Sequence, residues 1–471
     1  MKNTPFVLCV IILGISALQS ADPPQPEPVT FVASLKLTKD ERTVLERYIG
    51  HAVRYADSLS AQKVASRCLA SPEMFAWEEF LYLGALLDAY QLTEDTTYLD
   101  KFKQAFALFT DVLRKGDDGY LGWYGKPIPP RRMPGRPDLQ IDELQMNFRA
   151  IAILSRWVEL ARSDAEYARA NEGRISGYLE LMEKQLFPKW DERGFFVDMG
   201  SQGAVYRGLD YPLCDSREPG VTLPHEKCAI VVDGLLALYR ATGSPQYMRR
   251  AVQLGTRFKR SLSLKDGHYE WMSWEPAGSW DVDKSKPDGW RVEWIAPDPL
   301  GEWYVAAVSI AVNLYQYGLV FDEEDIARLI ATQKTRCWNG DFAAPEYRTV
   351  AGIGSAQNKY IKGQFLSFPL ALYDPDLSRL VFEGPHQKEI LEQSANSWKG
   401  GVAISPYIRA RYLMRPLVAN GRQPYTGYGD AYLDDADDRA FYKSLQFRVT
   451  EPGCLTPLKP SQMVYTLSQE P

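Results

Sequence analysis

The sequence contains little histidine and no closely spaced pair of cysteines. Only 4 of its 471 residues are His, and its 6 Cys are scattered without a Cys-x-x-Cys pair. Zinc sites are built from clustered Cys and His ligands. The chain also has no phosphate-binding loop, no G-x-S-x-G nucleophile elbow and no dinucleotide fingerprint. We therefore expect neither a metal nor another cofactor, and we favour chemistry carried out by carboxylates.

Long basic runs are also missing. Lys and Arg together number 54 against 60 Asp and Glu, which gives a formal charge of -6. A mildly acidic chain of this kind is a poor candidate for nucleic-acid binding. The longest apolar stretch is too short to span a bilayer comfortably, so we expect no integral membrane association.

That apolar stretch lies at the amino terminus, where Phe6 to Leu18 follows a single positive charge at Lys2. Small and polar residues follow it, in the order expected for a signal peptide with its cleavage zone. We predict a signal peptide over residues 1–21 and a proline-rich linker over 22–37. The protein would then be exported, to the periplasm or the extracellular space.

Aromatic residues are abundant, with 27 Tyr, 19 Phe and 12 Trp. Most such rings belong to protein cores. Carbohydrate-binding clefts also use aromatic rings, because ring faces pack on the apolar faces of sugars while neighbouring polar groups form hydrogen bonds. This composition makes an oligo- or polysaccharide the substrate class to test first.

A repeated unit organises the chain. An apolar helix, a short turn, an amphipathic helix and a glycine-aromatic hairpin follow one another over residues 84–123 and again over 234–271. Weaker copies begin near residues 151, 305 and 365. A repeated helical pair buries its apolar face only by packing against its neighbours. The repeats therefore predict one continuous helical array rather than several domains.

The predicted fold is all-α, an (α/α)6 toroid of about twelve helices in six inner and outer pairs. A lone first helix, about Thr38 to Val64, and a lone last segment, about Ser405 to Ala419, could pair to close the ring. Long loops connect each outer helix to the next inner helix, so the loops and their short β-hairpins would lie on one face. We predict the toroid domain over residues 38–420, followed by a carboxyl-terminal tail over 421–471.

Two sequence segments resemble segments of a known protein superfamily. Leu236–Tyr247 is similar to the turn between inner and outer helices in six-hairpin, (α/α)6-toroid carbohydrate-active proteins, and Phe187–Asp198 is similar to the hairpin that follows the helix in their sugar epimerases. The resemblance covers about Thr38 to Ala419. It implies a glycoside hydrolase, a polysaccharide lyase or a sugar epimerase. The 2-epimerases use paired histidines on inner helices, whereas here only His225 begins one.

Acidic residues recur where the inner helices are predicted to begin. Glycoside hydrolysis requires two carboxyl groups whose pKa values are pushed apart. A carboxylate at a helix start suits the base or nucleophile, and Glu293, flanked by Trp290 and Trp294, suits the acid. Each helix-start carboxylate could equally be a helix cap. The predicted catalytic residues are Glu293, Glu302, Glu226, Asp142, Glu143 and His225.

A polysaccharide lyase or uronyl epimerase would need other groups. A base such as His225 or a loop tyrosine such as Tyr206 would remove a proton beside a carboxylate, and arginines would bind that carboxylate. A third possibility is a non-catalytic glycan-binding or structural envelope protein. The predicted substrate-binding residues are Trp77, Trp271, Trp274, Trp290, Trp294, Trp303, Arg131, Arg132 and Arg291.

Overall fold

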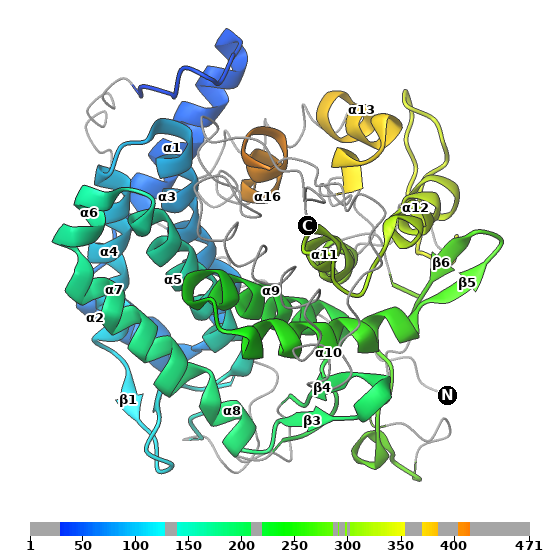
Figure 1. Ribbon diagram of the computed structural model, residues 1–471, viewed down its shortest axis with the longest axis horizontal. Coiled ribbons are helices and arrows are strands. Elements are labelled where there is room, and N and C mark those ends of the chain that lie inside the picture. Colours follow the sequence, from blue (N-terminus) through cyan, green and yellow to red (C-terminus); the bar gives the residue numbers. More distant parts are fainter. Residues whose placement is uncertain are drawn as a thin grey trace, which may run out of the picture.

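The computed structural model describes residues 29–127, 139–208, 219–285, 291, 297–298, 302–353, 370–384 and 404–414. Helices dominate this part of the chain, which confirms the predicted all-α class (Figure 1). Strands of two or three residues, within the same ranges, pair only as three antiparallel hairpins. The predicted signal peptide and tail lie outside the described residues.

The described elements succeed one another along the chain as follows. The α-helices are α1 (Lys39–Asp57), α2 (Ala61–Ala70), α3 (Phe80–Thr93), α4 (Thr97–Thr110), α5 (Leu144–Arg162), α6 (Ala165–Ala170), α7 (Glu172–Leu181), α8 (Pro188–Glu192), α9 (His225–Thr242), α10 (Pro245–Ser261), α11 (Glu302–Gln316), α12 (Glu323–Thr332), α13 (Pro375–Glu383) and α16 (Ser405–Ile408). The strands are β1 (Arg114–Lys115), β2 (Leu121–Gly122), β3 (Phe196–Asp198), β4 (Ala204–Tyr206), β5 (Ser263–Lys265) and β6 (His268–Glu270). Wider π-helical turns are η1 (Phe75–Glu79), η2 (Met182–Leu186), η5 (Gln333–Cys337) and η8 (Arg409–Leu413), and 3₁₀ turns are η3 (Gly200–Gln202), η4 (Ser279–Asp281) and η7 (Leu370–Leu372).

The predicted repeat is present in the connections. Each of the hairpins β1–β2, β3–β4 and β5–β6 follows a helical segment. After each hairpin, two residues of the following loop pair in an isolated antiparallel bridge, and the next helix begins shortly after it. These bridges are Gly125–Ile141 before α5, Arg207–Thr222 before α9 and Met272–Pro297 before α11. Three successive units thus share one order, in which a hairpin and a bridge precede the next helix.

The helices differ in burial in the way the sequence predicts. Helices α3, α5 and α9 are buried almost all round, whereas α10 and α12 bury one face and expose the other. Helices α5 and α9 pack closely against each other. A Cβ atom on Gly234 of α9 would lie 2.7 Å from the carbonyl oxygen of Phe148 on α5, so glycine allows this approach. Helices α3, α5 and α9 therefore contribute much of the hydrophobic core.

Local signals account for the ends of several helices. Gly243 and Gly318 adopt the left-handed φ values of 72° and 68° at the predicted helix stops. The Asp164 side chain accepts hydrogen bonds from two backbone N–H groups at the start of α6. One expectation is wrong: the first helix does not run unbroken from Thr38 to Val64. It ends at Asp57, and the Ser60 side chain caps a second helix, α2, by accepting from the Lys63 backbone N–H.

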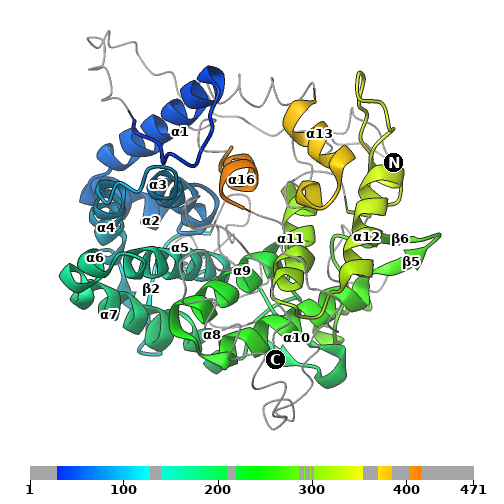
Figure 2. The ribbon, with the colours of Figure 1, turned by 45° about the horizontal axis from the view of Figure 1, so that its top comes forward.

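The first and last described segments contact each other (Figures 1 and 2). Residues of α16 and η8 pack on α3. The Arg411 guanidinium lies 2.9 Å from the Glu41 carboxylate of α1, and the Tyr412 hydroxyl donates to the same carboxylate. Toward the other side, the rings of Tyr407 and Phe382 join α16 to α13. In the ranges described here, no helix is long and apolar enough to cross a bilayer.

Candidate active site

The acidic residues predicted at helix starts do lie there. Glu226 is the second residue of α9, Glu302 is the first of α11, and Asp142 and Glu143 directly precede α5. Glu143 is buried at the N-cap position of α5. The side chains of Glu302 and Trp303 lie outside the described part of the structure. Location alone does not separate a catalytic carboxylate from a helix cap, so the contacts of each acidic side chain must distinguish the two roles.

A buried carboxyl group that the sequence did not single out lies just before α11. Asp298 is 1% exposed and accepts a hydrogen bond of 2.9 Å at Oδ2 from the Trp271 ring N–H. The Trp271 ring stacks on the Tyr304 ring of α11, with centroids 5.7 Å apart. The Val350 backbone N–H donates to the Asp298 carbonyl. Within the described ranges Oδ1 has no hydrogen-bond partner. Asp298 is thus fixed in position with one carboxyl oxygen unused.

Burial raises the pKa of Asp298 to about 8, against the opposing effect of the Trp271 hydrogen bond. The negative charge of Glu226 raises this pKa further. Asp298 is therefore protonated at neutral pH and able to donate a proton. Glu226 lies in the first turn of α9, where the helix dipole stabilises a negative side chain. The raised pKa of Asp298 and the helix-start position of Glu226 thus distinguish the two carboxyl groups.

His225, which precedes Glu226, is a buried and neutral imidazole. Burial, reinforced by the positive charge of Arg257, lowers its pKa to about 3. Its ring packs edge-on against Phe258 at 5.0 Å, and the structure as described gives Nε2 no hydrogen-bond partner. Since the imidazolium is disfavoured, His225 stays uncharged at neutral pH and is not a proton donor.

A small cavity lies behind His225. Its lining includes Thr222, Cys228, Arg257 and Glu275, and it measures about 20 Å³, room for roughly one water molecule. The Arg257 guanidinium donates to the Pro276 carbonyl and lies 3.7 Å from the Glu275 carboxylate. Burial raises the pKa of Glu275, and the Arg257 charge opposes this rise. These groups hold the loop that carries Trp271.

Asp281 anchors the same loop. Its fully buried carboxylate accepts hydrogen bonds from the backbone N–H and hydroxyl of Thr222, at 2.8 and 2.7 Å. The ring N–H of Trp274 donates to the Thr222 carbonyl, and Trp274 is fully buried. Arg291 donates to the carbonyls of Asp281 and Trp280. Trp274 and Arg291, which we predicted to bind substrate, thus stabilise the loop in this structure.

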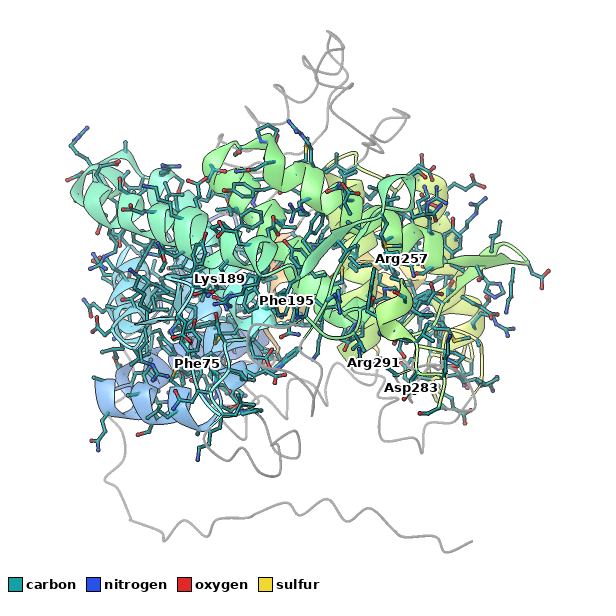
Figure 3. All side chains as sticks on the ribbon, turned by 90° about the horizontal axis from the view of Figure 1, so that it is seen from below. Phe75, Lys189, Phe195, Arg257, Asp283 and Arg291 are labelled. Carbon is teal, nitrogen blue, oxygen red and sulfur yellow. The ribbon has the colours of Figure 1, made fainter. Side chains whose placement is uncertain are left out.

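Asp142 belongs to a separate charged cluster. Its Oδ2 lies 2.7 Å from the Lys189 ammonium and 3.1 Å from the Arg193 guanidinium, and Asp142 and Lys189 are fully buried. The Asn147 amide donates to its other oxygen. In Figure 3 Lys189 lies to the left of Arg257, Asp283 and Arg291. We therefore assign Asp142 a structural role, holding the β1–β2 hairpin against α8.

The remaining predicted residues divide into two groups. Trp77 is partly buried in η1, where its ring N–H donates to Glu73 at 3.1 Å. The other group lies outside the described residues and comprises Glu293, Trp290, Trp294, Arg131 and Arg132. Of the predicted carboxylates with described contacts, Glu226 is the one whose charge acts on a second buried carboxyl group, that of Asp298.

Comparisons with known proteins give no independent identification. No family model, no curated protein and no solved structure matches this chain. The site must therefore be interpreted from its own geometry.

The ionisation of Asp298 is expected to be visible at Trp271, because the indole N–H donates to the ionising group. We expect the indole resonance of Trp271 in a ¹⁵N-tryptophan-labelled sample to titrate with a midpoint near pH 8. Glu226→Gln removes a charge that raises this pKa, so the midpoint should move to lower pH. Trp271→Phe assigns the resonance, and Asp266→Asn in the β5–β6 turn is the control. An unchanged midpoint in Glu226→Gln would contradict the coupling.

Proposed function

We propose that residues 38–420 form a closed (α/α)6 toroid. Three observations support this proposal. Inner and outer helices alternate along the chain, each of three hairpin loops returns to the next inner helix through a similar bridge, and the last described segment packs on the first. The ion pair between Arg411 and Glu41 would then close the ring.

We further propose that the protein is an exported glycoside hydrolase. The observation that supports this most directly is the buried carboxyl group of Asp298, whose pKa is raised by burial and by the charge of Glu226. Acid and base catalysis of glycosidic cleavage requires two carboxyl groups, one protonated and one ionised at the same pH. Glu226 lies in the first turn of α9, and Asp298 precedes α11, which packs against α9.

In this mechanism Asp298 donates its proton to the glycosidic oxygen as the bond from that oxygen to the anomeric carbon breaks. Glu226 supports the positive charge that develops on the sugar. In one route a Glu226 oxygen bonds to the anomeric carbon as the glycosidic bond breaks, and a water that gives its proton to the now ionised Asp298 then displaces the sugar from Glu226. In the other route Glu226 takes a proton from the water that attacks the anomeric carbon, and the stereochemistry of the product distinguishes the two routes. General acid catalysis of this kind contributes about 10²- to 10⁴-fold in rate.

The alternative of a lyase or epimerase has weaker support. Tyr206, a predicted base, is buried and donates its hydroxyl hydrogen to Asp191. Burial raises its pKa well above the ordinary value, with the nearby Arg250 charge opposing the rise. Arg207 donates to the carbonyls of Pro219 and Gly220. These groups have structural partners that a substrate would have to displace.

The experiment is to incubate the purified protein with a panel of neutral and uronate polysaccharides. Reducing ends and the ultraviolet absorbance of unsaturated sugars would be measured together. We expect new reducing ends without unsaturated product, and Asp298→Asn and Glu226→Gln should each lower the rate at least about 100-fold. Asp266→Asn, an exposed carboxylate in the β5–β6 turn, serves as the matched control.

Two outcomes would overturn the proposal. Unsaturated product would indicate a lyase instead. A protein that binds glycans but releases no product from any of them would be a binding protein. Activity that survives both substitutions would exclude this carboxyl pair and return attention to Glu302 and Glu293.

A further inference from the structure

A pocket of about 490 Å³ lies apart from the candidate active site. It is formed by the end of α4, the β1–β2 hairpin and α7. These elements lie on the left of Figures 1 and 2, whereas α11, which begins after Asp298, lies to the right of them. Small-molecule sites in proteins measure about 300–1,000 Å³, so this pocket has the size of a ligand site. The chemistry of its lining indicates which ligand it accepts.

Two glycines on α7 keep the pocket open. Gly173 and Gly177 are one helical turn apart, and both line the pocket and are exposed. A Cβ atom at either position would have no contact within 4 Å beyond its own helix backbone, and neither residue has a positive φ. Helix packing and backbone conformation therefore do not require glycine here, although glycine weakens a helix relative to alanine. What the pair provides is space along a flat strip of bare backbone.

Leucine side chains make other parts of the lining apolar. Leu113 and Leu121 are half-buried, and Leu181 is buried. The position of Leu121 is fixed, because its backbone N–H donates to the Gln185 side chain at 3.0 Å and its carbonyl accepts from Lys189 Nζ at 2.7 Å. These contacts hold the hairpin in place without a ligand. This wall is therefore preorganised, which lowers the entropic cost of binding.

Helix α7 also contributes two polar side chains. Tyr178 is 2% exposed, and the structure as described gives its hydroxyl no hydrogen-bond partner. Edge contacts with Phe106 and Trp157 fix its ring, at centroid distances of 5.8 and 5.2 Å. Burial raises the pKa of Tyr178 well above its ordinary value, with the Arg174 charge opposing the rise, so the hydroxyl is neutral. The exposed Arg174 guanidinium lies 5.6 Å from the centre of this ring, and within the described ranges it pairs with no acidic residue.

We propose that this pocket binds a small aromatic carboxylic acid. The planar ring lies between the glycine strip and the leucines, where its burial removes apolar surface from water. Arg174 binds the carboxylate, because a guanidinium forms two parallel hydrogen bonds with it. The hydroxyl of Tyr178 forms a hydrogen bond with a polar substituent at the other end of the ligand. This binding does not depend on the proposed hydrolase activity.

The test is calorimetry on the full chain with 2-naphthoate, its 6-hydroxy derivative and the neutral 2-naphthylmethanol. We expect one saturable site for 2-naphthoate and at least tenfold weaker binding of the alcohol. Arg174→Gln should weaken naphthoate binding about tenfold and leave the alcohol unchanged, because it removes a charge-assisted pair. Arg260→Gln, at an exposed position of α10, is the matched control. Tyr178→Phe should weaken the 6-hydroxy derivative about three- to tenfold and leave 2-naphthoate unchanged.

Filling the pocket tests its location. Gly177→Leu should lower naphthoate affinity at least tenfold while the melting temperature holds or rises, because the site has room and leucine favours a helix. Gly173→Leu is a second variant of the same wall, and Ser176→Leu adds the same side chain at a neighbouring exposed position that does not line the pocket. Only the two glycine variants should lose binding.

Four results would overturn the proposal. They are naphthoate binding that survives both glycine variants, equal binding of acid and alcohol, no saturable binding below about 1 mM, and self-association of the chain that Gly177→Leu abolishes. The last result, measured by sedimentation, would mean that a second copy of the chain fills the pocket.

Discussion

Replacing Asp298 with asparagine is expected to abolish most turnover and to stabilise the fold at neutral pH. The amide cannot donate the proton that the mechanism requires, so the rate should fall about 10²- to 10⁴-fold. The amide oxygen can still accept the hydrogen bond from Trp271, so the geometry of the loop should persist. Loss of activity with a gain of stability is the combination that a purely structural Asp298 would not show.

The direction of the stability change follows from proton linkage. The pKa of Asp298 is raised from an ordinary 3.8 to about 8 in the folded state, so the folded protein binds a proton that the unfolded chain has released. Its contribution to stability is fully present below about pH 4 and is lost as the pH rises through about 8. Asparagine has no proton to lose. The free energy of unfolding of the variant should therefore exceed that of the parent by up to about 4 kcal/mol at pH 7, and by little at pH 4.

Urea unfolding at pH 4, 7 and 9 measures this difference, with Asp266→Asn as the exposed control. Activity should be assayed on the same samples. If Asp298→Asn is less stable than the parent at pH 7, then Asp298 is ionised and held by partners, and it cannot be the acid. A variant that keeps full activity would remove Asp298 from the mechanism whatever its stability.

The regular parts of the fold were predictable because their signals are local. Glycines at helix ends, helix caps and the difference between all-apolar and one-sided helices are properties of short segments. They predicted the order of inner helix, outer helix and hairpin, and they placed Gly243 and Gly318 at helix stops. The break between α1 and α2 was missed because residues 39–64 remain helix-forming on both sides of it, and only the cap at Ser60 marks the new start.

The site was predictable only in part. Glu226 was found from its position at a helix start, which is again a local signal. Asp298 was missed because its raised pKa depends on burial, which the folded chain and not the local sequence produces. Its place between Pro297 and Pro299, at the end of a long loop and just before an inner helix, was the available signal. Asp142, like Glu226, lies close to the start of a helix, but it pairs with Lys189 and Arg193, more than 40 residues away.

The contrast between these two acids gives a second large expected effect. Asp142→Asn should destabilise the protein by about 3–5 kcal/mol while leaving the turnover of the folded molecules unchanged. The substitution leaves the fully buried ammonium of Lys189 without its counter-ion, and an unpaired buried charge costs about this much. Arg193 retains Asp118 as a partner, so the loss falls mainly on Lys189. Urea unfolding and the rate per folded molecule, measured on one sample, test both parts.

The pH dependence of the destabilisation by Asp142→Asn tests whether the unpaired Lys189 ammonium causes it. Burial lowers the pKa of Lys189 to about 8, and Asp142 opposes this shift. Without Asp142 the ammonium should lose its proton at lower pH still. The destabilisation by Asp142→Asn should therefore shrink as the pH rises from 6 to about 8, where the lysine of the parent also becomes neutral.

Adding Lys189→Met to Asp142→Asn removes the unpaired buried charge of the lysine and should recover most of the lost stability at pH 6. If the double variant stays as unstable as the single one, the ion pair is not what Asp142 provides. If Asp142→Asn instead loses turnover while its stability holds, Asp142 acts in the chemistry and the pair of Asp298 and Glu226 is incomplete.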